Sequence, residues 1–468
     1  MRSSTGRRLL AGAIALLALG LGFAVLGPRS DLRYDPARDY VYRFDPDIGV
    51  RVAVELTAEG LALTEPIAPG ASALLAVEVD SRHGGGLGTP HVDIRVGDGP
   101  PRRQYLESGA RGLRYLNLGA LDGNPPPRVV LEGHGVAWQP QATELLVFRN
   151  PPLDALRVLV LAPHPDDAEI AAFGLYSQTD ATVVTVTAGE AGDTGGLESH
   201  YDDAVQLYRA KGRLRVLDSL TVPRLGGVPP ERALNLGYFD DTLREMHDEP
   251  QRPVTSRFAE LSDPAFFRRH NDSPILPERD VASTWRDLVA DLAEILRRVD
   301  PNVIVAPHPL LDTHSDHRFT TVAAVAAAER VGWKAGEFYL YANHVLFAES
   351  HPEGPPDGVV SLPPFFTDRM EFQGFRSVPL TPERRIDKLF ALEANHDLRR
   401  PPPPVNRDWR DTRTSLVNGL QDLRRGRGHG RLDYFRRAPR PNEIFFVYSP
   451  AGTQALVTQL LEIDTAGG

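Results

Sequence analysis

Apolar and small or polar residues alternate along the first third of the chain. Residues 50–56 place valine or leucine at every second position, which predicts a strand with one buried face. Residues 91–96 alternate in the same way. Shorter apolar runs predict further strands at 74–79, 113–118, 129–131 and 145–148. Glycine- and proline-rich stretches separate these segments, so we expect an all-β, sandwich-like domain over residues 31–150.

The pattern changes after the Asn150-Pro151-Pro152 linker. Residues 157–161 form a nearly continuous apolar run, as expected of a strand buried on both faces of a parallel sheet. Similar strands are predicted at 182–186, 303–306 and 444–448, and helices at 285–298, 386–398 and 454–463. Strand–helix–strand alternation predicts an α/β domain with a Rossmann-like, largely parallel sheet over residues 155–463.

The N-terminus has a different pattern. A basic segment, residues 1–8, precedes an uncharged run over 9–27, whose 19 residues would span about 28 Å as a helix. One interpretation is a transmembrane anchor with residues 1–8 in the cytoplasm, and the other is a cleaved signal sequence. Both predict that the rest of the chain lies outside the cytoplasm, either membrane-anchored (periplasmic or extracytoplasmic) or secreted.

Composition narrows the classes of function. A length of 468 residues suggests two or three domains, and a net charge of −10 argues against a nucleic-acid partner. The chain has no cysteine, so a metal would be held by histidine and carboxylate side chains.

Two predicted strands lead directly into side chains suited to metal chemistry. The strand at 157–161 continues into Pro163-His164-Pro165-Asp166-Asp167, and the strand at 303–306 leads to Asp312-Thr313-His314-Ser315-Asp316-His317. Ligands bind at the carboxyl ends of strands in open α/β sheets. Two histidines and one aspartate would leave positions for water and substrate, as in catalytic zinc sites.

These paired motifs resemble the PIG-L/LmbE superfamily of metal-dependent deacetylases, closely over residues 156–317 and loosely to residue 448. The stretch 187–192 is similar to the family's Thr-x-Gly-Glu-x-Gly turn, and 236–240 more weakly resembles a substrate-side loop. The chain departs from the family pattern at its Arg-x-x-Glu helix, where Arg213 fits only by its spacing.

The resemblance implies a role for each motif residue. His164, Asp167 and His317 would bind the metal, which would be Zn²⁺ or else Fe²⁺, Co²⁺ or Mn²⁺. Asp166 would be the general base, and His314 would stabilise the oxyanion and help to protonate the leaving amine. Asp312 and Asp316 would orient the histidines.

The activity implied is a zinc-dependent N-deacetylase, a hydrolase of linear amide bonds. Its substrate would be an N-acetylglucosamine-type group of an envelope glycan, glycolipid or glycoconjugate. Two alternatives stay open: an amidase acting on another sugar-amide conjugate, and a catalytically decayed glycan-binding protein of the cell envelope.

Structural explanations compete with the functional ones. Asp166 and Asp167 could cap the following helix, and Glu190 could simply hold its turn. We expect His308 and His396 to be non-ligand residues. Trp138 and Tyr115 could form a sugar-stacking platform, although core packing is the preferred interpretation. Likewise, a spacer or packing role is preferred for the β-domain over carbohydrate binding.

Overall fold

The structure, a computed structural model, describes residues 32–63, 70–81, 89–120, 128–192, 194, 200–399 and 434–466. Within these ranges, no helix combines the length and the apolar character needed to cross a membrane. The predicted N-terminal anchor or signal, residues 9–27, lies outside them.

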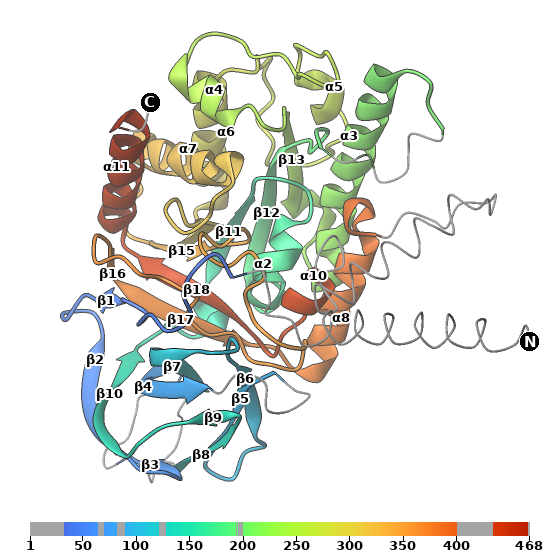
Figure 1. Ribbon diagram of the computed structural model, residues 1–468. Helices are drawn as coiled ribbons and strands as arrows, with labels where there is room; N and C mark the ends of the chain where they lie inside the picture. The colour runs from blue at the N-terminus through green and yellow to red at the C-terminus, as the bar shows by residue number, and fades with distance from the viewer. Residues whose placement is uncertain are drawn as a thin grey trace, which may run out of the picture.

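Two antiparallel sheets form the first part of the chain (Figure 1). One sheet has the order β2-β10-β4-β7, with β9 paired to β4, and the other has the order β3-β8-β5-β6. A shared apolar cluster, which includes Leu75, Ile94 and Val129, joins them. The strands are β2 (Val50–Leu56), β3 (Gly60–Ala62), β4 (Ser72–Ser81), β5 (His91–Val96), β6 (Arg102–Tyr105), β7 (Arg111–Ala120), β8 (Arg128–His134), β9 (Val136–Ala137) and β10 (Gln141–Phe148).

A seven-stranded sheet of order β13-β12-β11-β14-β15-β18-β17 forms the second part. Its first five strands are parallel, and β18 runs antiparallel to both of its neighbours. The predicted mixed α/β class with parallel strands is therefore confirmed. The strands are β11 (Arg157–Ala162), β12 (Asp180–Thr187), β13 (Ala233–Tyr238), β14 (Val303–Pro307), β15 (Glu337–Tyr341), β17 (Gly374–Pro379) and β18 (Asn442–Tyr448).

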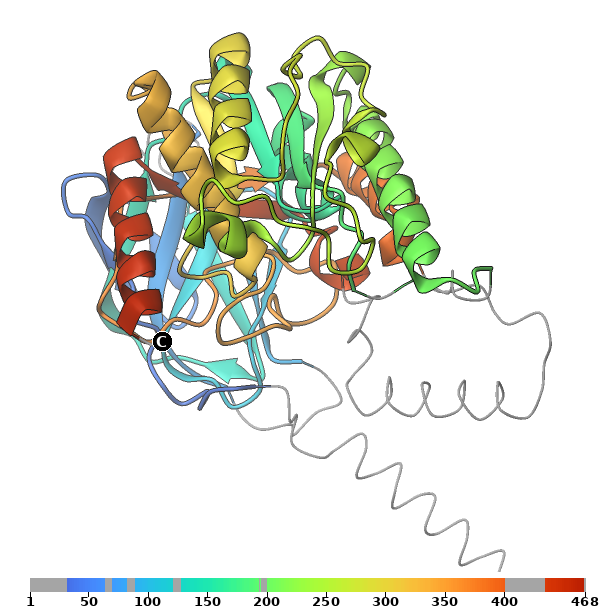
Figure 2. The same ribbon diagram turned by 90° about the horizontal axis from the view of Figure 1, so that it is seen from above.

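Helices cover both faces of this sheet, as Figure 2 shows from above. Leu159 and Leu161 of β11 belong to an apolar cluster with residues of α6 (Trp285–Val299), α7 (Ser315–Val331) and α11 (Pro450–Ala466). Val158 and Val160 face the other way, toward α2 (Asp167–Tyr176) and α8 (Pro382–Ala394). Burial on both faces explains why β11 is apolar at nearly every position. The remaining helices are α3 (Ala204–Thr221), α4 (Leu243–Asp248), α5 (Ala265–Arg268) and α10 (Tyr434–Arg437).

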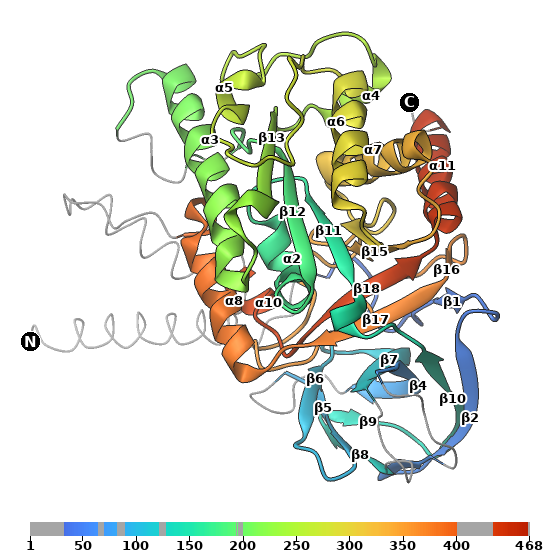
Figure 3. The same cartoon turned by 180° about the vertical axis from the view of Figure 1, so that it is seen from behind.

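The two parts share an interface in which β7 lies beside β17 (Figure 3). Strand β1 (Arg43–Phe44) pairs in parallel with β16 (Glu371–Phe372) of the α/β part. The side-chain amide of Asn117 donates to the carbonyl of Val360 at 2.7 Å and to Oγ of Ser377 at 3.1 Å. The β-domain is thus joined to the α/β domain by backbone pairing and by buried polar contacts.

Candidate metal centre

The predicted site residues meet at one edge of the seven-stranded sheet. They follow the carboxyl ends of four parallel strands, β11, β13, β14 and β15. In the sheet, β11, β14 and β15 are adjacent, and β12 separates β13 from β11. Chain reversals after parallel strands bring these loops together, as expected for this architecture. The side chains gathered there are His164, Asp166, Asp167, Asp240, Asp312, His314, Asp316, His317 and Asn343.

Asp167 lies between the two histidines predicted to bind the metal. Its Oδ2 is 3.2 Å from Nδ1 of His164 and 3.2 Å from Nε2 of His317. Ligands held at about 2.0–2.1 Å around a tetrahedral ion are separated by about 3.3 Å. Two of the three separations among these donors, which come from two distant motifs, therefore match the spacing around a zinc-sized cation.

The second nitrogen of each histidine contacts another carboxylate. Nδ1 of His317 is 3.0 Å from Oδ2 of Asp312, and Nε2 of His164 is 2.9 Å from Oδ1 of Asp240 and 3.5 Å from Oδ2 of Asp316. Carboxylates commonly fix the tautomer of ligating imidazoles in this way. The contacts leave Nδ1 of His164 and Nε2 of His317 directed at Asp167.

The other oxygen of Asp167 is already engaged. Nδ2 of Asn343, which follows β15, donates to Oδ1 of Asp167 at 2.7 Å. The backbone N–H of His164 donates to Oδ2 at 3.0 Å. Asp167 is therefore held with Oδ2 toward the histidines.

The titration behaviour of these groups reflects a strongly negative environment. Burial alone would lower the pKa of His317, but Asp167 and Asp312 outweigh it and raise that pKa to about 10. Burial would also lower the pKa of His164, and the surrounding carboxylates, Asp240 first, raise it well above its usual range. Carboxylates that stabilise the protons on these histidines this strongly would also stabilise a divalent cation bound in place of those protons.

Asp166 is separate from this set of donors. Its backbone is left-handed, with φ of 112°, and its side chain makes no capping hydrogen bond to α2. Its Oδ2 instead accepts a hydrogen bond of 3.1 Å from Nη2 of Arg215. Burial raises the pKa of Asp166 to about 8, although Arg215 opposes the shift. The capping interpretation is therefore wrong for Asp166, whose carboxylate is free of the helix.

His314 precedes α7 and faces both predicted histidine ligands. Its ring centroid is 4.9 Å from the ring of His164 and 4.9 Å from that of His317. Its Nδ1 is buried without a hydrogen-bond partner, and burial together with the two histidines lowers its pKa to about 4. One ligand atom from each of the three histidines lies within 4.8 Å of the others, so His314 shares the same small space.

Residues 159–328 match the model of the PIG-L family, whose description is GlcNAc-PI de-N-acetylase. The chain carries a PIG-L family domain. The match includes the metal-centre motifs and ends before β15, so Asn343 lies beyond it. None of the curated proteins matches the sequence.

Several solved structures are similar to this chain at low identity. The conserved protein TT1542 from Thermus thermophilus is 20% identical, with a TM-score of 0.29, and the match covers 62% of this chain and 94% of that one. The 4-carboxy-2-hydroxymuconate hydratase GalB from Pseudomonas putida is 15% identical, with a TM-score of 0.30 and coverages of 62% and 95%. A family two carbohydrate esterase from Cellvibrio japonicus is 12% identical, with a TM-score of 0.16 and coverages of 63% and 90%.

Glu190 lies in the turn after β12 and supports the candidate metal centre. Its carboxylate accepts hydrogen bonds from the backbone N–H of Asp240 at 3.1 Å and from Oγ of Ser256 at 2.7 Å. Burial raises the pKa of Glu190 to about 8. Glu190 therefore fixes the loop that carries Asp240, which agrees with the turn-holding interpretation.

In the helix where the sequence spacing suggested Arg213, Arg215 is the arginine that reaches the site. Arg213 is exposed, whereas Arg215 is buried and also donates to the carbonyl of Gly189 at 2.9 Å. Gly189 has φ of +63°, and a Cβ there would lie 2.5 Å from Nη1 of Arg215. A glycine is therefore required at this point of the Thr-x-Gly-Glu-x-Gly turn.

The other histidines and aromatic residues that the sequence singled out have structural roles. His308 is buried, and its Nδ1 accepts from the backbone of the following turn. His396 pairs with Asp218 at 2.7 Å. Tyr115 is buried, and Trp138 is partly buried against the core of the β-domain, so core packing accounts for both.

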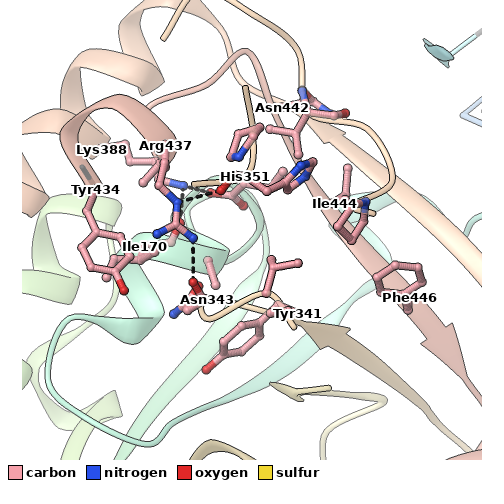
Figure 4. A pocket seen from close by; sticks show the side chains of 18 residues that line it. Ile170, Tyr341, Asn343, His351, Lys388, Tyr434, Arg437, Asn442, Ile444 and Phe446 are labelled. Atoms are coloured by element: carbon pink, nitrogen blue, oxygen red, sulfur yellow. Dashed lines mark hydrogen bonds and ion pairs between the residues drawn. The ribbon is translucent and has the colours of Figure 1, made fainter. Parts of the chain in front are cut away.

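A cavity adjoins the centre through Asn343 (Figure 4). It has a volume of about 90 Å³ and lies between α2, α8, α10 and β18. Arg437 donates to the carbonyl oxygens of Asn343 and His351, each at 2.7 Å. Arg437 thus fixes the backbone of the residue that orients Asp167.

Proposed function

We propose that this protein is a metal-dependent N-deacetylase that hydrolyses the acetyl amide of an N-acetylglucosamine-type group. The PIG-L family domain supports a hydrolase of the deacetylase type. The observation that carries the proposal is the position of Asp167 Oδ2, 3.2 Å from a ring nitrogen of each of two histidines. Asp166 lies beside this set, held separately by Arg215.

His164, Asp167 and His317 would hold the metal. Two imidazoles and one carboxylate suit Zn²⁺, and Fe²⁺, Co²⁺ or Mn²⁺ can take the same set. When bound, the ion polarises the amide carbonyl and makes water acidic enough to attack at neutral pH. His314 stays outside the ligand set in this proposal, because Asp167 already lies at ligand spacing from both other histidines.

Asp166 would move the proton. A divalent cation beside Asp166 would favour its ionised form, whose carboxylate accepts a proton from the attacking water, while the hydrogen bond from Arg215 fixes its orientation. The carboxylic acid then returns this proton to the departing nitrogen as the C–N bond breaks. The second proton of the water also ends on the nitrogen, so the products are the protonated amine and acetate. General acid–base transfer of this kind contributes about 10²–10⁴-fold to the rate.

His314 would bind the carbonyl oxygen. Its imidazole is neutral at physiological pH, because burial lowers its pKa to about 4, so it can donate one hydrogen bond without carrying a charge. Its Nδ1 is buried and makes no hydrogen bond within the protein. A donor directed at a developing oxyanion is worth roughly 2.7–4 kcal/mol in well-studied enzymes.

The proposed substrate is an amino-sugar glycan, glycolipid or glycoconjugate of the cell envelope. This part rests on the apolar segment over residues 9–27, which would export the chain and either anchor it in the membrane or be cleaved. The proposal includes no nucleic-acid partner, since the net charge is −10.

Acetate release from N-acetylglucosaminyl oligosaccharides and glycolipids by the zinc-loaded full chain tests the proposal. Asp166→Asn should keep its zinc and lose about 10²–10⁴-fold in kcat, because the general base is gone. His317→Ala should lose the zinc of this centre and its activity. Asp248→Asn, an exposed aspartate outside the site, is the matched control. Normal turnover by Asp166→Asn would contradict the general-base role of Asp166. A folded chain that binds no zinc would contradict the proposed metal-dependent activity.

A further inference from the structure

A second group of metal-binding side chains lies on the outer face of the β-domain. In β5, Val92 and Ile94 point into the core, so His91 and Asp93 point outward. In the neighbouring strand β8, His134 is directly opposite His91 and Glu132 is directly opposite Asp93. The register therefore places two histidines and two carboxylates in one two-by-two array.

The donor atoms of this array are close together. Nε2 of His134 is 3.4 Å from Oδ2 of Asp93 and 3.5 Å from Oε1 of Glu132. The rings of His91 and His134 stack with centroids 4.6 Å apart and planes inclined by 20°. One ligand atom from each of His91, Asp93 and His134 lies within 4.8 Å of the others. The two nitrogen–oxygen distances approach the value of about 3.3 Å expected around a tetrahedral ion.

Two of the side chains are held in place by neighbours. Nδ1 of His91 is 2.9 Å from the carbonyl oxygen of Thr89, and a carbonyl can only accept, so Nδ1 carries the hydrogen. The lone pair of His91 is therefore on Nε2, the tautomer that binds a metal. Arg103 donates two hydrogen bonds to the carboxylate of Asp93, from Nε to Oδ1 at 2.8 Å and from Nη2 to Oδ2 at 2.9 Å.

The charges of the array also favour a cation. Asp93 and Glu132 are like charges directly opposite each other, which destabilises an antiparallel pair unless something neutralises them. Arg103, which donates to both oxygens of Asp93, balances one of the two charges. Glu132 contacts His134, and 73% of the Glu132 side chain is exposed, so its carboxylate can turn toward an ion.

We propose that His91, Asp93 and His134, with Glu132 as a fourth ligand, bind a divalent transition metal of the Zn²⁺ class. Two imidazoles favour such an ion over Ca²⁺ or Mg²⁺, which prefer oxygen ligands alone. The site shares no residue with the candidate catalytic centre. In Figure 1, β5 and β8 lie in the lower part of the molecule, away from α3 and α6. Because the ligands come from two adjacent strands, the bound ion would join β5 to β8.

Zinc stoichiometry tests the proposal directly. The full chain is stripped with a chelator, reloaded with ZnCl₂ and passed through gel filtration before its zinc is measured. We expect two zinc ions per chain for the wild type and one for His134→Ala. His270→Ala, which removes a partly buried histidine outside every ligand cluster found in the described ranges, should keep two. Acetate release should be unchanged in His134→Ala.

The His317→Ala background separates the two sites. Its catalytic centre should be empty, so the remaining zinc belongs to the β-domain and should disappear in His317→Ala/His91→Gln. Zinc alone should also raise the melting temperature of His317→Ala, because a ligand that binds only the folded chain stabilises it. A wild type that holds a single zinc lost on His317→Ala, or a His134→Ala variant that keeps two, would overturn the proposal. Should His134→Ala fail to fold, the wild-type stoichiometry and the melting shift of His317→Ala still decide the question.

Discussion

Arg215 donates a hydrogen bond of 3.1 Å from Nη2 to Oδ2 of Asp166, and both side chains are buried. The same guanidinium also donates to the carbonyl oxygens of Pro165 and Gly189. Arg215 therefore ties the two turns after β11 and β12 to the carboxylate that we propose as the general base.

Arg215→Lys should lower kcat about 10–100-fold without changing zinc content, because a lysine keeps the charge and loses the forked donor geometry. Arg213→Lys is the matched control, two residues earlier on the same helix and exposed. Steady-state acetate release and metal analysis measure both effects. Equal activity of the two variants would remove Arg215 from the proton-transfer machinery.

Asp312→Asn should weaken zinc binding by about 10–100-fold. Oδ2 of Asp312 is 3.0 Å from Nδ1 of His317, so the carboxylate fixes the ligating tautomer, and an amide can present its N–H there instead. Competition against a chromophoric chelator gives the affinity. Asp300→Asn, whose side chain is 83% exposed, should bind zinc as tightly as the wild type. An unchanged affinity for Asp312→Asn would show that His317 needs no such support.

Gly189→Ala should lower both stability and activity, whereas Gly227→Ala should lower stability alone. Both glycines have positive φ, +63° and +86°, so alanine costs about 1 kcal/mol in either backbone. Only at Gly189 would the new Cβ meet Arg215; at Gly227 nothing lies within 4 Å. Urea unfolding and kcat distinguish the two costs. Full activity in Gly189→Ala would mean that Arg215 can shift without consequence.

His308 should make the protein sensitive to mild acid. Burial lowers its pKa to about 3, below the ordinary value of about 6.5, so the unfolded chain binds a proton that the folded chain does not. Stability is therefore lost as the pH falls below about 6.5, by up to roughly 1.4 kcal/mol per pH unit until about pH 3.

His308→Asn isolates this contribution. Its side-chain oxygen can still accept from the backbone N–H groups of Leu310 and Leu311, as Nδ1 of His308 does, and it does not titrate. The free energy of unfolding should then fall less steeply between about pH 6.5 and 5 than in the wild type. Parallel pH profiles for the two chains would contradict the assignment.

The sequence was most informative where structure is local. The strand at 157–161 and the turn with His164 and Asp167 could be predicted because an apolar run buried on both faces ends at a contiguous motif. The role of Asn343 could not, since this residue follows β15 (Glu337–Tyr341), lies outside both motifs and meets Asp167 only through tertiary structure. Strand β13 (Ala233–Tyr238) was missed too, and with it the position of Asp240 beside His164.

Arg215 illustrates a second limit of sequence spacing. A helix turns about 100° per residue, so two positions apart means nearly opposite faces. Spacing along the chain suggested Arg213, but the packing of α3 against β13 decides which face is inside, and it buries Arg215. The motif is local, whereas the choice between the two arginines depends on tertiary packing.

The position of Tyr42 has a consequence for the ancestry of the chain. Its ring lies 4.7 Å from Phe372 and 5.5 Å from Phe365, and its hydroxyl donates to the carbonyl of Pro363 at 2.6 Å. Genetic recombination at the Asn150 linker would therefore separate Tyr42 from the residues of the α/β domain against which it packs. We expect the two domains to be inherited as one unit, with any swap of the sandwich retaining residues 40–44.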